Sequence, residues 1–365
     1  MKIGRLMAHS AASAPHPAPP GDAADAIPPE CDGHAVGNHQ PSWSRHTYAA
    51  IDLGTNNCRL LVARPVAGGF TVLDAFSRIV RLGEGLGTSG RLSDAAMDRA
   101  VDALGICADK LKRRRVSLAR SVATEACRRA VNGREFVDRV HRETGISLEI
   151  IPPQEEARLA VLGCHKLLEP GDGPALIFDI GGGSTELVLV EPGGADDSPR
   201  IKAWWSAPWG VVSLTESEGR AALEGPDRVA AYGRMRERTR RAFSRFEALL
   251  PSNPRDIRLL GTSGTVTTLA SVHLALPSYD RKAVDGLHVP IGAMREISTT
   301  IAGMTFEQRA ALPCIGAERA DLVVAGCAIL EAILDIWPAE QLGIADRGIR
   351  EGILRAMMAR DGYRL

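Results

Sequence analysis

A short motif that occurs twice constrains the fold of this chain more than any other feature of its sequence. Residues 51–56 read IDLGTN, and residues 178–185 read FDIGGGST. In each copy an apolar run ends in an aspartate, a polar turn that contains glycine follows, and a second apolar run begins. This pattern predicts two strands joined by a tight turn. Because the copies lie far apart in the chain, we interpret them as an internal duplication, with one copy in each of two domains.

The turns of both copies have the composition of phosphate-binding loops. Glycine lets backbone N–H groups approach phosphate oxygens closely, and the hydroxyl groups of Thr55, Ser184 and Thr185 are further donors. Asp52 and Asp179 would repel a bare phosphate, so we expect them to hold Mg²⁺ or to orient an attacking water. A single turn of this kind is as often only a tight hairpin. Two copies in matched contexts favour a phosphate clamp between the domains.

The rest of the sequence predicts alternating strands and helices, which is typical of an α/β protein. Ser93 is expected to cap a long helix that ends in the basic residues 112–115, and Gly145 is expected to end another helix. The glycine-rich residues 261–265 lead from a predicted strand into a helix, which suits a phosphate or a nucleotide at the helix N-terminus. This third turn is a weak indication on its own, because many α/β proteins begin helices in this way.

The composition of the chain limits its partners. Of the 365 residues, 44 are Lys or Arg and 44 are Asp or Glu, so the formal net charge is zero. Without a global basic field, we expect no DNA partner and no membrane partner, and a polyanion would be held by local arginines and backbone amides. The seven cysteines are scattered without a CxxC pair. This argues against a disulfide framework and a zinc site, and it favours the cytoplasm.

Composition also divides the chain into segments. Residues 1–45 are rich in Ala, Pro, His and Gly and contain no apolar core of the signal-peptide type, so we expect a disordered extension and no export. The pattern breaks again near residue 170, just before the second copy of the motif. We therefore place the first domain at residues 46–168 and the second at residues 169–365, with the last helix as a candidate to pack back on the first domain.

The three turns together resemble a known superfamily. Residues 52–57, 179–186 and 261–265 look like the two phosphate motifs and the adenosine-type motif of the actin, hexokinase and heat-shock-chaperone superfamily. More narrowly, they resemble the exopolyphosphatase and guanosine pentaphosphate phosphohydrolase family. Four further segments support the narrower resemblance: ATEACR at 123–128, EEARL at 155–159, WGVVSLT at 209–215 and RGIREG at 347–352. The resemblance extends from residue 48 to the C-terminus and looks like the short, two-domain type of this family.

The resemblance implies two ribonuclease-H-like domains with a cleft between them, and a hydrolase that releases terminal phosphate from polyphosphate. Guanosine pentaphosphate is the alternative substrate, and a homodimer is an open expectation. The implied cofactor is Mg²⁺, with other divalent ions and K⁺ as alternatives, held by Asp52, Asp179 and Glu186. Glu156 is implied as the general base. The implied phosphate-binding residues are Gly54, Thr55, Asn56, Asn57, Arg59, Thr124, Arg128, Gly181, Gly182, Gly183, Ser184, Thr185, Gly261, Ser263, Gly264 and Thr265.

Structural interpretations stand beside these functional ones. Glu155 and Glu156 also suit the first turn of a helix, where the helix dipole favours acids. Arg128 could instead form a surface salt bridge. Trp204, Trp205 and Trp209 could stack on a base, but packing is the favoured role. At the level of function, the alternatives are an ATP-dependent kinase or ATPase switch and a non-catalytic sensor of polyphosphate or alarmone.

The sequence departs from the family pattern at two places. The first turn reads GTNN, where the family usually has GSNS, and both replacements keep hydrogen-bond donors. Pro152 and Pro153 stand where Ser-Gly is usual. Proline cannot donate an N–H group, so we expect substrate contacts at this loop to differ and the reaction to be retained.

Overall fold

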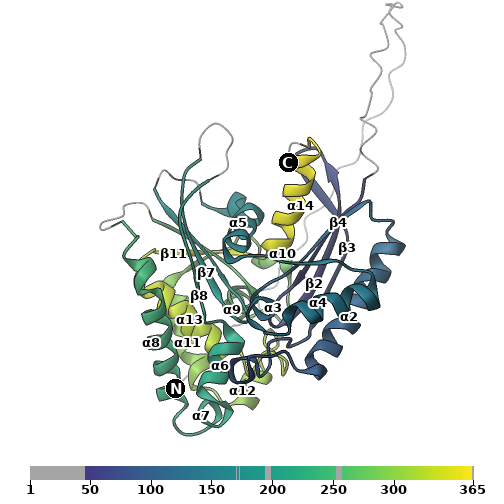
Figure 1. The fold of residues 1–365 in the computed structure, drawn as a ribbon. Coiled ribbons are helices and arrows are strands. Elements are labelled where there is room, and N and C mark those ends of the chain that lie inside the picture. Colours follow the sequence, from purple (N-terminus) through teal and green to yellow (C-terminus); the bar gives the residue numbers. More distant parts are fainter. Residues whose placement is uncertain (1–45, 170, 172, 194–198, 252–256, 364–365) are drawn as a thin grey trace, which may run out of the picture. The chain divides into compact units, whose positions relative to one another are not determined.

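Two mixed β-sheets carry the fold, and each contains one copy of the duplicated motif. The computed structural model describes residues 46–169, 171, 173–193, 199–251 and 257–363. The predicted extension over residues 1–45 lies outside the described residues, and the predicted boundary at residue 168 stays a prediction. Figure 1 shows the two sheets with their helices.

The first sheet has the strand order β3-β2-β1-β4-β5. Strand β1 pairs antiparallel with β2 and parallel with β4, so the first copy of the motif forms the predicted hairpin at the centre of the sheet. The strands are β1 (Tyr48–Leu53), β2 (Asn57–Val66), β3 (Gly69–Ile79), β4 (Leu118–Ala123) and β5 (Leu148–Ile150).

The second sheet repeats this arrangement and adds one strand. Its order is β8-β7-β6-β9-β11-β10, so β6 and β7 take the places of β1 and β2. The register is also repeated, because Asp52 pairs with Arg59 across the first hairpin and Asp179 pairs with Glu186 across the second. The duplication is therefore present in topology and in register. The strands are β6 (Ala175–Ile180), β7 (Thr185–Glu191), β8 (Arg200–Ala207), β9 (Arg258–Thr262), β10 (His288–Pro290) and β11 (Gln341–Ala345).

The helices begin and end largely where the local signals predict. Ser93 caps its helix by accepting a hydrogen bond from the backbone N–H of Ala96, and Gly145 adopts the left-handed conformation after another helix. The first-half helices are α1 (Leu86–Ser89), α2 (Asp94–Arg113), α3 (Glu125–Arg129), α4 (Gly133–Thr144), α5 (Pro153–Cys164) and the 3₁₀ turn η2 (His165–Leu167). The others are α6 (Val211–Glu218), α7 (Arg220–Glu224), α8 (Arg228–Glu247), α9 (Gly264–His273), α10 (Arg281–Val284), α11 (Ile291–Gly303), α12 (Phe306–Ala310), α13 (Val323–Ile336) and α14 (Ile349–Arg360).

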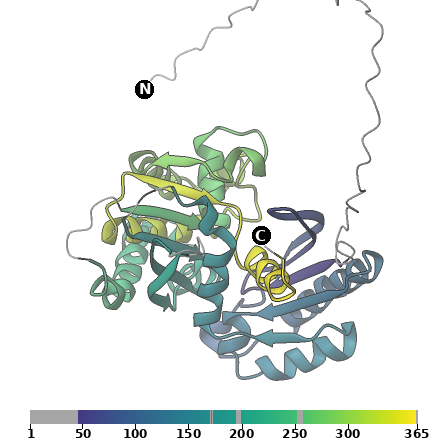
Figure 2. The ribbon, with the colours of Figure 1, turned by 90° about the horizontal axis from the view of Figure 1, so that it is seen from above.

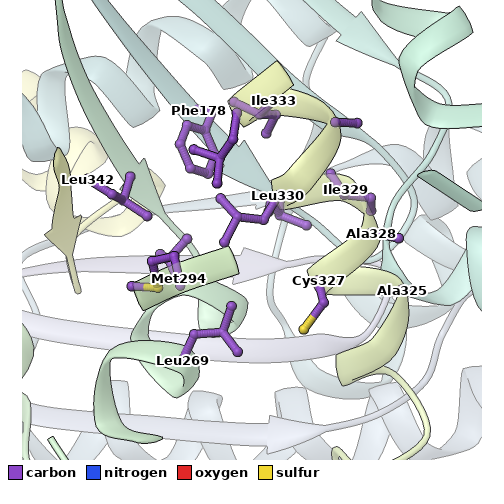
Figure 3. Packing of buried hydrophobic residues seen from close by; sticks show 14 of the residues in the cluster. Phe178, Leu269, Met294, Ala325, Cys327, Ala328, Ile329, Leu330, Ile333 and Leu342 are labelled. Carbon is purple, nitrogen blue, oxygen red and sulfur yellow. The ribbon is translucent and has the colours of Figure 1, made fainter. Parts of the chain in front are cut away.

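Helix α13 forms the centre of the larger hydrophobic core. Its sequence VVAGCAILEAILDI is apolar apart from Glu331 and Asp335, as expected for a helix largely surrounded by protein. It contacts β6, α8, α9 and α11. Figure 3 shows its residues Leu330 and Ile333 beside Phe178 of β6, with Leu269 and Met294 from neighbouring helices. The core thus fixes the strand that ends in Asp179.

The last helix, α14, follows β11 of the second sheet but packs on the first. It contacts α5 and β1, and its residues Ile353 and Met358 belong to the same buried cluster as Tyr48. Figure 2 shows α14 close to β1. The helices α5 and α14 touch backbone to backbone, since a methyl group at Gly163 would lie 2.0 Å from the carbonyl oxygen of Gly348. Within the described residues, no helix has the length and apolar character needed to cross a membrane.

Candidate active site

The turns of the two motifs meet at one cavity of about 490 Å³. They are in direct contact, since a methyl group at Gly182 would lie 3.1 Å from the backbone nitrogen of Asn56. A methyl group at Gly183 would lie 2.7 Å from the hydroxyl oxygen of Thr55. Only glycine fits at these two positions without a shift of the facing turn. The cavity therefore lies beside the contact between the two turns.

Both turns close in the same way and present backbone amides. The Gly54 N–H donates to the carbonyl oxygen of Asn57 over 2.9 Å, and the Gly181 N–H donates to that of Ser184 over 3.0 Å. The third turn adds the N-terminus of α9, where the Ser263 hydroxyl accepts hydrogen bonds from the backbone N–H groups that follow. Three turns and one helix N-terminus around a single cavity suit a polyanionic phosphate ligand.

Six carboxylates of the described residues line the same cavity, and four of them belong to the predicted site residues: Asp52, Glu156, Asp179 and Glu186. Burial raises the pKa of Asp179 to about 8, and the nearby Glu186 adds to this shift. Burial also raises the pKa of Glu186, although its Oε1 accepts hydrogen bonds from the hydroxyl groups of Ser184 and Ser206 at 2.7 and 2.8 Å. The cavity thus contains buried carboxyl groups whose ionised forms are disfavoured by burial.

Glu156 is the carboxylate that a guanidinium holds directly. It lies in the first turn of α5, with 6% of its surface exposed. Both Nη atoms of Arg128 donate to Glu156 Oε2 over 3.1 Å, and Nη1 also donates to the carbonyl oxygen of Ile151 over 2.7 Å. Burial, then Glu186, raises the pKa of Glu156, and Arg128 opposes this shift. A buried, oriented carboxylate with a raised pKa has the character of a general base.

Glu125 completes this arrangement from the other side of Arg128. Arg128 donates from Nε and Nη2 to Glu125 Oε2 over 3.1 and 2.7 Å. Both residues belong to α3, three positions apart, so the pair forms within one helix. Arg128 is therefore fixed between the carboxylates of Glu125 and Glu156.

Comparisons with known proteins show the family to which the chain belongs. Residues 61–361 match the Ppx/GppA phosphatase family. The chain belongs to the Ppx/GppA phosphatase family. It is 32% identical over 320 residues to exopolyphosphatase 2 of Mycobacterium tuberculosis, covering 84% of this chain and 96% of that protein. It is also 32% identical over 321 residues to the guanosine-5'-triphosphate,3'-diphosphate pyrophosphatase of Aeromonas hydrophila, covering 85% of this chain but 59% of that protein.

Solved structures of Ppx/GppA proteins share the fold. The Aquifex aeolicus family member superposes with a TM-score of 0.71 and 28% identity, covering 87% of this chain and 99% of that one. An exopolyphosphatase from Cytophaga hutchinsonii gives a TM-score of 0.77 and 25% identity, with the same coverage of both chains. The predicted actin-like fold with two α/β halves is thereby confirmed.

The cavity of this Ppx/GppA protein is lined by most of the site residues that the sequence predicts. They are Asp52, Gly54, Thr55, Asn56, Asn57, Arg59, Thr124, Glu156, Asp179, Gly181, Gly182, Gly183, Ser184, Glu186, Ser263, Gly264 and Thr265. Three predicted phosphate contacts do not line it. Arg128 lies behind Glu156, as described above. The Thr185 hydroxyl donates to the carbonyl oxygen of Trp209 over 2.7 Å, and Gly261 packs against the ring of Phe178.

Several lining residues are not predicted from the sequence. Arg78 reaches the cavity from the end of β3, and Glu318 and Arg319 reach it from the segment before α13. No local motif marks these residues, because they come to the site only through the packing of distant segments. Glu125 is the exception, since it lies inside the quoted segment ATEACR and could have been chosen with Thr124.

The proline replacement preserves the position of Glu156. Pro152 is the N-cap of α5 and Pro153 is its first residue, where a missing N–H group leaves no intrahelical bond unmade. The Pro152 carbonyl oxygen accepts from the N–H groups of Glu155 and Glu156 over 3.0 and 3.1 Å. The helix therefore begins normally despite the departure from the family pattern.

Two of the three clustered tryptophans, Trp205 and Trp209, have the packing role that the sequence favours. Trp205 donates its indole N–H to the carbonyl oxygen of Ala242 over 3.1 Å, and Arg238 lies 5.4 Å from the ring centre of Trp209. Both rings pack on the larger core. Trp204 differs, with 37% of its surface exposed. None of the three is among the described residues that line the cavity.

The donor set fits a hydrated magnesium ion better than an all-protein metal cage. Within the described part of the chain, no three His, Cys, Asp or Glu side chains lie close enough together to hold a metal ion. Mg²⁺ commonly takes one or two carboxylates and completes its shell with waters and substrate phosphates. Asp52, Asp179 and Glu186 offer such carboxylates beside the phosphate turns, and burial raises the pKa of all three. A bound cation would favour their ionised forms.

Proposed function

We propose that this chain is an exopolyphosphatase, which releases orthophosphate from the end of inorganic polyphosphate by attack of water. The observation that carries the proposal is Glu156, a buried carboxylate fixed by Arg128 beside two facing phosphate turns. The relatives support the polymer over the nucleotide. The chain matches nearly the full length of exopolyphosphatase 2 of Mycobacterium tuberculosis, but only 59% of the Aeromonas hydrophila pyrophosphatase.

The proposed reaction uses the cavity residues in separate roles. The backbone amides of the turns at Gly54 and Gly182 bind the oxygens of the terminal phosphate. Glu156 accepts a proton from water, and the resulting nucleophile attacks the terminal phosphorus in line with the bridging oxygen. The bond to that oxygen breaks, and the shortened chain leaves. Arg59, which lies near Asp52 and Asp179, supplies positive charge at the same end of the cavity.

In this proposal, one or two of the carboxylates of Asp52, Asp179 and Glu186 would hold Mg²⁺, and waters and substrate phosphates would complete its shell. When bound, the ion would neutralise charge on the phosphate oxygens. K⁺ and other divalent ions stay alternatives for an activity assay to separate. The described cysteines are free thiols, which supports the proposed cytoplasmic location. A homodimer stays a prediction, and analytical ultracentrifugation would test it.

Phosphate release from three substrates tests the proposed function. Short polyphosphate, long polyphosphate and guanosine pentaphosphate would each be assayed with Mg²⁺ and with EDTA. The proposal expects Mg²⁺-dependent release from polyphosphate with the higher kcat/KM. If phosphate is released from guanosine pentaphosphate alone, the proposed exopolyphosphatase activity is contradicted and the nucleotide is the favoured substrate. Binding of polyphosphate without any release would favour a non-catalytic sensor.

A further inference from the structure

The segment between β3 and α2 holds the first phosphate turn in place. The N–H groups of Val80 and Arg81 both donate to the carbonyl oxygen of Asn56, over 2.8 and 3.0 Å. The Gly83 N–H donates to the carbonyl oxygen of Thr55 over 2.9 Å. Thr55 and Asn56 belong to the turn that contacts Gly182 and Gly183 beside the cavity. Any displacement of residues 80–86, here called the strap, is therefore passed to the first phosphate turn.

The strap also contacts the second half of the molecule. Nη2 of Arg81 lies 3.1 Å from Oδ2 of Asp321, which stands just before α13. The Gly85 N–H donates to Oε1 of Glu216 in α6 over 2.8 Å. Asp321 follows Arg319, a cavity-lining residue, by two positions. The strap thus joins the first phosphate turn to two segments on the opposite side of the cavity.

The backbone of the strap has an unusual conformation and packs tightly against the first phosphate turn. Arg81 has a φ of 48°, a left-handed conformation that is uncommon for a residue other than glycine. Such a conformation persists only where neighbouring contacts require it. A methyl group at Gly83 would lie 2.2 Å from the Thr55 side chain. From this backbone the Arg81 side chain reaches Asp321 of the second half, two positions after the cavity-lining Arg319.

We propose that Arg81 and Asp321 form a latch that holds the two halves closed over the substrate, so that both are positioning residues for the reaction. The effects that we expect on KM and kcat rest on the proposed function, because they are measured with polyphosphate as the substrate. The apparent dissociation constant of a ligand rises as the competent fraction of the protein falls. Opening of the latch is therefore expected to raise KM and to leave kcat nearly unchanged, because Glu156 and Arg128 lie in the same half and keep their contact.

The size of the effect follows from the exposure of the pair. The Arg81 and Asp321 side chains are 39% and 25% exposed, so their attraction is partly screened by water. Pairs of this kind contribute little energy, and we expect a KM increase of about three-fold for either single substitution. The Gly85–Glu216 contact keeps the strap partly attached in such variants.

A double-mutant cycle tests the latch. Arg81→Ala, Asp321→Asn and the double variant would be compared with wild type for KM and kcat on polyphosphate. Arg64→Ala, which removes an exposed arginine of β2 outside the cavity, is the matched control. If the latch exists, KM should rise about three-fold in each single variant and should rise no further in the double variant. Additive increases, or unchanged KM in the single variants, would overturn it.

Amide hydrogen exchange separates failure of the latch from failure of the proposed function. Exchange at residues 54–57 and in the strap should be faster in Arg81→Ala than in wild type and in Arg64→Ala, whether or not polyphosphate is the substrate. Equal exchange in all three proteins would contradict the latch even if phosphate is released. If wild type releases no phosphate but Arg81→Ala still exchanges faster than wild type, the proposed function is contradicted and the latch is supported.

Discussion

Arg128 donates from both of its terminal nitrogens to one carboxylate oxygen of Glu156, each over 3.1 Å. Its third contact, to the carbonyl oxygen of Ile151, anchors the guanidinium to the backbone just before α5. The sequence predicts Arg128 as a phosphate contact, whereas the structure places it behind the carboxylate. We infer that Arg128 orients Glu156 and does so without lining the cavity.

Replacement of Arg128 by lysine should therefore lower kcat more than it raises KM. Lysine keeps the charge but cannot form the planar fork, so Glu156 loses its fixed orientation. We expect a fall in kcat of about 10- to 100-fold, by analogy with lost positioning of a general base. Steady-state kinetics on polyphosphate would measure this. Arg129→Ala is the matched control, because Arg129 has only a weak 3.9 Å pair with Glu125. A rise in KM alone would instead favour the phosphate-contact role.

The stability of the metal-free protein should fall as pH rises from about 5 to 8. The pKa values of Glu156 and Asp179 are raised in the folded state, the latter to about 8, so the folded protein binds more protons than the unfolded chain across this range. Stability then decreases as the pH rises. Thermal unfolding in EDTA should show this fall, and the fall should be shallower in Glu156→Gln, because that variant lacks one of the carboxyl groups with a raised pKa. A flat profile in EDTA would contradict the buried charge cluster.

Magnesium should oppose the same loss of stability. A cation between the carboxylates favours their ionised forms, so it binds more tightly as they lose protons. Unfolding temperatures measured at pH 8 should rise on addition of Mg²⁺, and the rise should be smaller at pH 5. Equal effects at both pH values would indicate that the ion binds elsewhere.

The crossing of α5 and α14 should not tolerate side chains. A methyl group at Gly163 would lie 2.0 Å from the carbonyl oxygen of Gly348, and one at Gly352 would lie 2.0 Å from that of Leu159. Gly163→Ala should therefore destabilise the protein by about 2–3 kcal/mol or more through overpacking. Gly105→Ala in α2 is the control, since its methyl group meets nothing within 4 Å. Chemical denaturation should show a slight gain for Gly105→Ala, of about 0.5–1 kcal/mol.

The local features of this fold are those that the sequence predicts best. Asp52 and Asp179 mark the two hairpins because apolar runs, glycine and a terminal aspartate stand together in the chain. Helix α8 is an exception, because it is not among the predicted helices although its buried residues Met235, Thr239, Phe243 and Phe246 recur every three or four positions. Its buried face is therefore recorded in the local periodicity of the sequence.

In the site, too, residues within a local motif are predicted from the sequence, whereas residues brought in by distant segments are not. The turn residues are found from sequence, yet Thr185 points away from the cavity because successive side chains of a strand alternate between faces. Its neighbours Ser184 and Glu186 do line the cavity. Arg78 and Arg319 reach the cavity through the packing of segments far apart in the chain, which no local pattern records.

The measurement that tests the central claim most directly is phosphate release by Glu156→Gln beside Glu155→Gln. Glu155 is the adjacent acid, but it pairs with Arg120 and Arg158 and does not line the cavity. If Glu156 activates water, Glu156→Gln should lose about 10²- to 10⁴-fold in kcat while still binding polyphosphate, and Glu155→Gln should stay within about two-fold of wild type. Normal turnover by Glu156→Gln would contradict the account.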